Sequence, residues 1–206
     1  MLSANFALEF RVALLIHHNY LRATLGTNFF EAAFKRAAKA AGHDIEVAPD
    51  GTRFWDVALD GRKISLKSSA AASMRDGKLH ISKLCEAAWI QDVRGAAARE
   101  SATKQLFSEF TTLVDCIVQL RFVRKTSTYE LVRIPSSVFA QIANVPRAEF
   151  APDGPSIGIP VGQSPPDFTL KLDRSDAKIT LANIDKAVCQ VLGSWHLNYD
   201  GILQTP

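Results

Sequence analysis

The sequence has few cysteines and no long apolar run, and each shortage excludes a class of protein. The three cysteines in 206 residues, Cys85, Cys116 and Cys189, are odd in number and far apart. They fit neither a disulfide framework nor a zinc site, so we expect buried free thiols in a reducing compartment. The apolar run Val12–Ile16 near the N-terminus is too short to span a bilayer. We therefore expect no signal peptide, no transmembrane helix and a cytoplasmic location.

Two common hydrolytic chemistries also lack their characteristic residues. The five histidines show no metal-binding spacing, and no serine stands in a nucleophile-elbow pattern. Zinc catalysis and catalysis by a Ser-His-Asp triad are therefore both disfavoured. The histidines are His17, His18, His43, His80 and His196.

The composition is that of an ordinary globular domain with a mild positive charge. Hydrophobic residues make up 47% of the chain and charged residues 22%, so there is enough apolar surface to offset the entropy of ordering the chain. A length of 206 residues favours a single domain. The net charge of +3 permits nucleic-acid binding without requiring it.

The N-terminal part of the chain predicts two helices followed by a β-hairpin. Phe6–Leu25 has helical character, and Asn28–Ala41 repeats alanine and phenylalanine at helical spacing. Two β-rich runs follow, Arg53–Leu59 and Lys63–Ser68, and Asp60-Gly61 separates them. This dipeptide is a strong signal for a two-residue type I′ turn.

That turn also fixes the pairing of the two predicted strands. Counted outward from it, Asp56 faces Ser65, and Lys67 lies diagonal to Asp56 on the same face of the hairpin. Glu31 lies upstream, in the early turns of the second helix. The sequence therefore places an aspartate and a lysine together on one surface, with a second acid on a neighbouring helix.

The rest of the sequence alternates between helical and β-rich segments. We expect one α/β domain with a central mixed sheet flanked by helices: a catalytic core in residues 1–134, and a Pro/Gly-rich β subdomain in residues 135–206 packed on that core. The expected segments include a helix from Lys83 to about Val93, a helix Ala96–Val114, a hairpin of Cys116–Val123 and Thr128–Ile134, short strands at Ile157–Val161, Phe168–Leu172 and Lys178–Leu181, and a C-terminal helix Asn183–Trp195.

Asp56, Lys67 and Glu31 are residue types that metal-assisted phosphodiester hydrolysis requires. Carboxylates hold Mg²⁺ on the scissile phosphate, and a cation stabilises the charge of the transition state or orients the attacking water. The arrangement resembles the Glu…Asp…(D/E)xK core of the PD-(D/E)xK nuclease superfamily, in which a helix contributes the first acid and two adjacent strands contribute the rest. The resemblance implies a restriction-endonuclease-like fold and a catalytic role for all three residues, with Asp56 and Glu31 as metal ligands.

The sequence departs from that pattern at Ser65, where the superfamily usually has Asp or Glu. A serine hydroxyl is a poor Mg²⁺ ligand beside a carboxylate, so the site lacks one acid. Some type II restriction endonucleases have a similar Ser-x-Lys and place the missing glutamate on the following helix. Glu86, on the helix expected from Lys83 onward, is the residue that we expect to complete the site as a catalytic metal ligand.

Each of these residues also has a purely structural interpretation. Glu31 can pair with Lys35, four residues away on a solvated helix face. Lys67 can be an edge-strand lysine that blocks aggregation, and Glu86 can be a surface residue at the rim of the core. Asp50 matches the literal Pro-Asp of the superfamily name, but Pro-Asp-Gly is an ordinary turn sequence and lies outside the strand pair.

The resemblance implies an Mg²⁺-dependent endonuclease that hydrolyses double-stranded DNA at a short specific site, a type II restriction endonuclease. Cutting both strands normally requires two active sites, so a two-fold symmetric homodimer is the simplest assembly. Two alternatives stay open: a DNA repair or recombination nuclease of the same superfamily, and a non-catalytic DNA-binding relative. Six basic residues are expected to contact DNA phosphates or, equally, to be solvated surface charge. They are Arg94, Arg99, Lys104, Arg121, Arg124 and Lys125.

Overall fold

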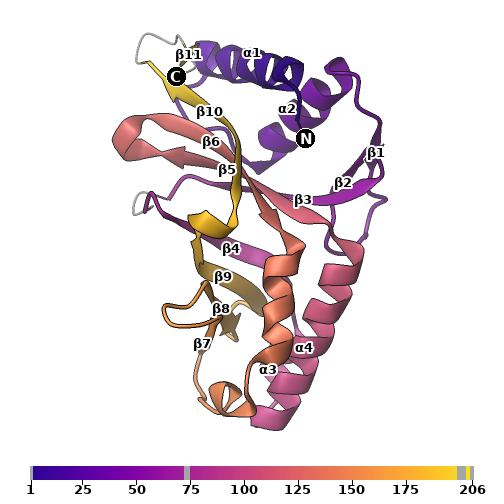
Figure 1. Ribbon diagram of the computed structural model, residues 1–206, viewed down its shortest axis with the longest axis vertical. Coiled ribbons are helices and arrows are strands. Elements are labelled where there is room, and N and C mark those ends of the chain that lie inside the picture. Colours follow the sequence, from indigo (N-terminus) through magenta and orange to yellow (C-terminus); the bar gives the residue numbers. More distant parts are fainter. Residues whose placement is uncertain (1, 72–74, 199–202, 205–206) are drawn as a thin grey trace. The chain divides into compact units, whose positions relative to one another are not determined.

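The computed structural model describes residues 2–71, 75–198 and 203–204, and the chain forms two compact units (Figure 1). The first unit contains residues 1–74, 116–134 and 189–206, and the second contains residues 75–115 and 135–188. The two units are interleaved along the sequence, and each has its own β-sheet.

The first unit is a seven-stranded mixed sheet with two helices. The strands lie in the order β1-β2-β3-β5-β6-β10-β11, with β3 and β5 parallel and β2 and β3 antiparallel. The sequence prediction of an α/β fold with a central mixed sheet and flanking helices is confirmed. The elements are α1 (Ala4–Tyr20), α2 (Thr27–Ala40), β1 (Ile45–Val47), β2 (Val57–Leu59), β3 (Arg62–Ser69), β5 (Cys116–Val123), the 3₁₀ turn η1 (Arg124–Thr126), β6 (Thr128–Pro135), β10 (Gln190–Leu197) and β11 (Leu203–Gln204).

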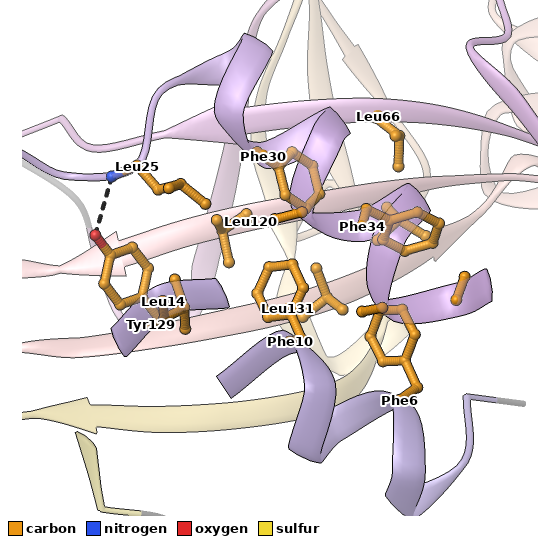
Figure 2. Close-up of a cluster of buried hydrophobic side chains, with 14 of the residues drawn as sticks. Phe6, Phe10, Leu14, Leu25, Phe30, Phe34, Leu66, Leu120, Tyr129 and Leu131 are labelled. Atoms are coloured by element: carbon orange, nitrogen blue, oxygen red, sulfur yellow. Dashed lines mark hydrogen bonds between the residues drawn. The ribbon is translucent and has the colours of Figure 1, made fainter. Parts of the chain in front are cut away.

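Both helices of the first unit bury aromatic side chains against one face of its sheet (Figure 2). Phe10 of α1 and Phe30 of α2 meet edge to face, with ring centroids 6.1 Å apart. Leu66, Leu120 and Leu131 from three strands belong to the same buried cluster. Burial of large apolar side chains is the main force that holds helix and sheet together. It also fixes the position of α2, which carries Glu31 directly after Phe30.

The hairpin of β2 and β3 has the register that its turn predicts. Leu59 pairs with Arg62 and Val57 pairs with Ile64. Asp60 and Gly61 both adopt positive φ, 51° and 78°, as a type I′ turn requires. The pairing places Asp56, the residue before β2, opposite Ser65 of β3. This prediction from the sequence is confirmed.

The second unit is built on a four-stranded antiparallel sheet in the order β4-β9-β8-β7. Buried apolar residues alternate with more exposed residues along β7 and β8, so one face of these strands is buried and the other is wetter. In the described part of either unit, no helix combines the length and the apolar character needed to cross a membrane. The elements are β4 (Lys78–Glu86), α3 (Trp89–Asp92), α4 (Ala96–Leu113), the 3₁₀ turns η2 (Ser136–Asn144), η3 (Arg147–Phe150) and η4 (Lys186–Val188), β7 (Ser156–Val161), β8 (Phe168–Asp173) and β9 (Lys178–Asp185).

Two predicted helices are wrong. The segment from Lys83 onward continues the strand β4 to Glu86, and only the four residues of α3 are helical before Val93. The segment Asn183–Trp195 contains the end of β9 and most of β10. Both segments pair with distant strands, β4 with β9 and β10 with β6, and such pairing overrides a local helical pattern.

The two compact units coincide only in part with the expected core of residues 1–134 and appended subdomain of residues 135–206. A boundary does fall between residues 134 and 135. However, residues 75–115 belong to the second unit because β4 pairs with β9, and residues 189–206 return to the first because β10 pairs with β6.

Candidate active site

Asp56 holds a well-defined position at the start of β2. Its backbone N–H donates to the carbonyl of Ile64 at 2.9 Å, as part of the hairpin ladder. Its carboxylate oxygen Oδ2 accepts hydrogen bonds from the Leu66 N–H at 2.5 Å and from the Ser65 hydroxyl at 3.3 Å. The other oxygen, Oδ1, has no hydrogen bond to a described residue. The half-buried carboxylate is therefore oriented through one oxygen, and its second oxygen is available to a ligand.

Ser65 supports this carboxylate. The side chain is fully buried on β3 and donates to Asp56. A neutral hydroxyl that already donates to a carboxylate contributes little to holding a divalent cation. The structure thus gives Ser65 a role in orienting Asp56, in the place where the superfamily usually has an acid.

Lys67 lies two residues beyond Ser65, so both side chains lie on the same face of the sheet. The intervening residue, Leu66, points to the opposite face and joins the aromatic core. Lys67 is half-buried, and its ammonium makes no hydrogen bond or ion pair with any described residue. The predicted pairing of an aspartate and a lysine on one face of the hairpin is present.

Glu31 of α2 is electrostatically coupled to both of these residues. Its pKa is raised above the ordinary value, first by burial and then by the negative charge of Asp56, while the charges of Lys35 and Lys67 lower it. A 2.8 Å hydrogen bond between the hydroxyls of Thr27 and Ser68 links the start of α2 to β3. The structure thus brings Glu31, Asp56 and Lys67 into one electrostatic neighbourhood.

This neighbourhood fits a hard divalent cation. Burial and the charge of Asp56 raise the pKa of Glu31, and a bound cation would offset the repulsion between the two acids. In the ranges that the structure describes, no group of three or more His, Cys, Asp or Glu side chains lies close enough to hold a metal ion. Mg²⁺ commonly binds through only one or two carboxylates together with water and substrate phosphate. Glu31 and Asp56 are the two acids of this neighbourhood that could supply those carboxylates.

Asp50 and Glu86 lie in other environments. Asp50 is exposed in a turn that Thr52 closes by donating its N–H to the Pro49 carbonyl. Glu86 ends β4 in the second unit and forms a 2.7 Å ion pair with Lys83, which lowers its pKa. The prediction that Glu86 lies on a helix is therefore wrong, because Glu86 ends a strand. The role of Glu86 as a metal ligand stays a prediction.

Two of the six basic residues expected at DNA are buried and engaged inside the protein. Arg99 is 4% exposed and donates to the carbonyls of Phe150 and Pro152 at 2.9 and 2.6 Å. Arg121 is 1% exposed and lies 3.3 Å from a carboxylate oxygen of Glu130. Both guanidinium groups are thus buried and engaged inside the protein, and their contact with DNA phosphates stays a prediction that would require them to leave these partners.

The other four basic residues stay predictions as DNA contacts. Arg124 and Lys125 are exposed in the connection between β5 and β6, within the same unit as Asp56. Arg94 is exposed at the C-terminal side of α3, and Lys104 of α4 is half-buried and paired with Glu100 at 2.9 Å.

One polar residue near the site was not singled out from the sequence. Gln119 is buried in β5, and it pairs with Lys67 across the parallel strands. Its signal in the sequence is weak but present: Gln119 and Arg121 interrupt the apolar run Cys116–Val123 at alternate positions. That period places both polar side chains on one face of the strand.

Three comparisons relate this chain to known nucleases. A family model described as SmaI, type II site-specific deoxyribonuclease, matches residues 1–197. The type II restriction enzyme SmaI of Serratia marcescens is 27% identical over 135 residues, which are 64% of this chain and 52% of that enzyme. This chain thus spans about half the length of the curated relative it matches. A solved restriction endonuclease in complex with substrate DNA superposes with a TM-score of 0.35 and 15% identity, over 69% of this chain and 63% of that one.

Proposed function

Because this chain belongs to the SmaI family of type II site-specific deoxyribonucleases, we propose that it hydrolyses phosphodiester bonds of double-stranded DNA at a short specific site. The observation that carries this proposal is the electrostatic grouping of Glu31, Asp56 and Lys67 on and beside one hairpin. Acids that hold a cation and a lysine that faces the same space are the groups that phosphodiester hydrolysis needs.

The proposed cofactor is Mg²⁺. Type II restriction endonucleases generally use divalent metals, and Glu31 together with the Oδ1 oxygen of Asp56 would hold one here. When bound, the ion would neutralise charge on the phosphate and favour deprotonation of water. Glu86 stays in the proposal as a third acid, because the position of Ser65 supplies none.

The protein's own groups have separate tasks in this proposal. The Leu66 N–H and the Ser65 hydroxyl orient Asp56 before substrate arrives, so little reorganisation is needed during the reaction. Lys67 stabilises the negative charge that develops on the phosphate in the transition state. The Lys67 ammonium has no hydrogen-bond or ion-pair partner among the described residues, so no such contact must break before it binds the phosphate.

We also propose that two copies of the chain act as a homodimer, because a two-fold symmetric pair presents one active site to each DNA strand. A cytoplasmic location fits the three cysteines, all of which are free thiols. Analytical ultracentrifugation with and without a DNA duplex measures the assembly state. A monomer in both conditions would contradict the dimer without touching the assignment of the active site.

The direct test is digestion of a DNA of known sequence with Mg²⁺, followed by mapping of the ends. Discrete fragments that disappear with a chelator support the proposal. Nicks or smears would instead indicate a repair or recombination nuclease, and binding without cutting would indicate a non-catalytic relative. The Asp56→Asn variant, purified in the same way, shows whether any cleavage comes from this site or from a contaminating nuclease.

A further inference from the structure

The strand β5 has two chemically different faces. Every residue from Cys116 to Val123 is buried, yet only alternate residues, Val118 and Leu120 among them, belong to the aromatic core of the first unit. The other face carries Gln119 and Arg121. A buried amide costs free energy unless its polar atoms are hydrogen-bonded, and Gln119 does have an interaction partner within the fold.

The register of β5 places Gln119 beside the candidate active site. In the parallel pair β3·β5, Lys67 is the Cα partner of Gln119, and Ser65 is the partner of Ile117. Partners in a ladder project to the same face, so Gln119 is the immediate neighbour of Lys67 across the strands. The polar face that begins at Asp56 and Ser65 thus continues through Lys67 to Gln119.

The burial of Gln119 indicates whether this residue contacts the substrate directly or acts through Lys67. The residue is 1% exposed, so it cannot touch DNA or an attacking water without rearrangement of the strand. Lys67 is half-buried and has four rotatable side-chain bonds, and no described group fixes its ammonium. A lysine side chain loses much rotamer entropy when its ammonium is held in one position for catalysis. A fixed hydrogen-bond acceptor nearby restricts the side chain before the chemical step, so less of this entropy is lost during that step.

We propose that Gln119 is a positioning residue for the proposed hydrolysis. Its side-chain carbonyl oxygen accepts a hydrogen bond from the Lys67 ammonium when DNA is bound, and this contact holds the charge toward the phosphate. The proposal rests on the nuclease function proposed above, but it concerns only how Lys67 is held. It requires an acceptor at position 119 and no particular charge there.

Two substitutions distinguish a Gln119 side chain that accepts a hydrogen bond from one that only fills space. Gln119→Met keeps the shape and removes the acceptor, and Gln119→Glu keeps an acceptor at the same place. We expect Gln119→Met to lower kcat by about tenfold with KM for DNA changed less than about twofold, and Gln119→Glu to keep most of kcat. Leu120→Met is the matched control, because it changes the same strand on the opposite face and should leave kcat unchanged.

A second readout needs no cleavage. The side-chain mobility of Lys67, measured by NMR relaxation of its Cε methylene in complex with a DNA duplex, should rise in Gln119→Met and not in Gln119→Glu. Wild-type kcat in Gln119→Met would overturn the proposal, as would unchanged Lys67 mobility. A loss shared equally by Met and Glu variants would show a packing role instead. Absence of cleavage by the wild-type protein would count against the nuclease function alone, since the mobility measurement still tests Gln119.

Discussion

The backbone N–H of Leu66 donates a 2.5 Å hydrogen bond to Oδ2 of Asp56. This contact joins the aspartate to the strand that carries Lys67, one residue further along. The relative placement of acid and lysine therefore depends on the register of the hairpin, which the positive φ values of Asp60 and Gly61 set. A one-residue slip would move Lys67 to the aromatic core and the site would be lost.

Replacement of Asp56 by Asn should abolish Mg²⁺-dependent cleavage. The amide keeps the size of the side chain and can still accept from Leu66, but it removes the charge that holds the cation. The thermal midpoint should change little, because no cavity forms. Asp50→Ala is the control, since Asp50 is exposed and should be dispensable. An inactive Asp50→Ala protein beside an active Asp56→Asn protein would reverse the assignment.

Truncation of Lys67 to Ala should reduce the rate of the chemical step far more than the affinity for DNA. A charge that acts on the transition state typically contributes about 10²-fold or more to kcat. Single-turnover cleavage gives the rate, and fluorescence anisotropy with Ca²⁺ in place of Mg²⁺ gives the affinity. Equal losses in both would identify Lys67 as a phosphate anchor.

The Glu31→Gln variant should be more stable than the wild-type protein at pH 7 without metal, and less active with it. The pKa of Glu31 is raised above 4.5 in the folded state, so the folded protein binds this proton more tightly than the unfolded chain does. That stabilisation is complete below pH 4.5 and is lost as the pH rises through the higher folded pKa. Ionised Glu31 therefore costs stability at neutral pH, and glutamine removes the cost.

Thermal unfolding from pH 4 to 8, with and without Mg²⁺, measures this effect. Without metal, the difference between Glu31→Gln and wild type should shrink toward low pH. Mg²⁺ should raise the thermal midpoint of the wild-type protein more than that of the variant. If Mg²⁺ raised the thermal midpoint of both proteins equally, Glu31 would not be a metal ligand. Glu9→Gln, on the neighbouring helix α1, is a suitable control for loss of one negative charge.

Glu86→Ala should impair cleavage severely if Glu86 completes the metal site. The carboxylate must first leave Lys83, so Lys83→Ala should not reduce activity by the same mechanism. Ser65→Glu, which restores an acid beside Asp56, should partly rescue Glu86→Ala. Cleavage rates of the single and double variants decide the matter. Full activity of Glu86→Ala would leave Glu31 and Asp56 as the only ligands from this set.

The double variant Arg124→Ala/Lys125→Ala should weaken DNA binding for every sequence by a similar factor. Each lost phosphate contact lowers the slope of log affinity against log salt by about 0.9, so the slope should fall by roughly 2. Both side chains are exposed beside β5 and β6. Titration from low to high salt with specific and nonspecific duplexes measures the slopes. An unchanged slope would show these charges to be solvated surface residues.

The half of the site that lies on the hairpin could be predicted from sequence because its determinants are local. Asp60-Gly61 dictates the turn, the turn dictates the register, and the register puts Asp56 and Lys67 on one face. Glu31 also followed, since alanine and phenylalanine at helical spacing define the buried side of α2.

The parts that failed depend on partners far away in the sequence. The sequence predicts a helix from Lys83 onward that includes Glu86, yet Glu86 ends a strand that pairs with β9, about ninety residues later in the chain. Gln119 cannot be recognised from the sequence for a similar reason. A lone polar residue in an apolar strand has no visible meaning until the parallel pairing with Lys67 is known.

The interleaved chain gives the second unit two attachments that are not equally dispensable. Residues 70–115 connect β3 to β5, and residues 136–189 connect β6 to β10, and each connection joins neighbouring strands of the first sheet. Since β6 and β10 are antiparallel, a two-residue turn would satisfy that connection; β3 and β5 are parallel and need a crossover of about a dozen residues or more. A variant in which a tight turn replaces residues 136–189 would therefore keep the strand order of the first sheet, but β4 would lose its partner β9. A variant that lacks residues 70–115 would still need a crossover long enough to join the parallel strands β3 and β5.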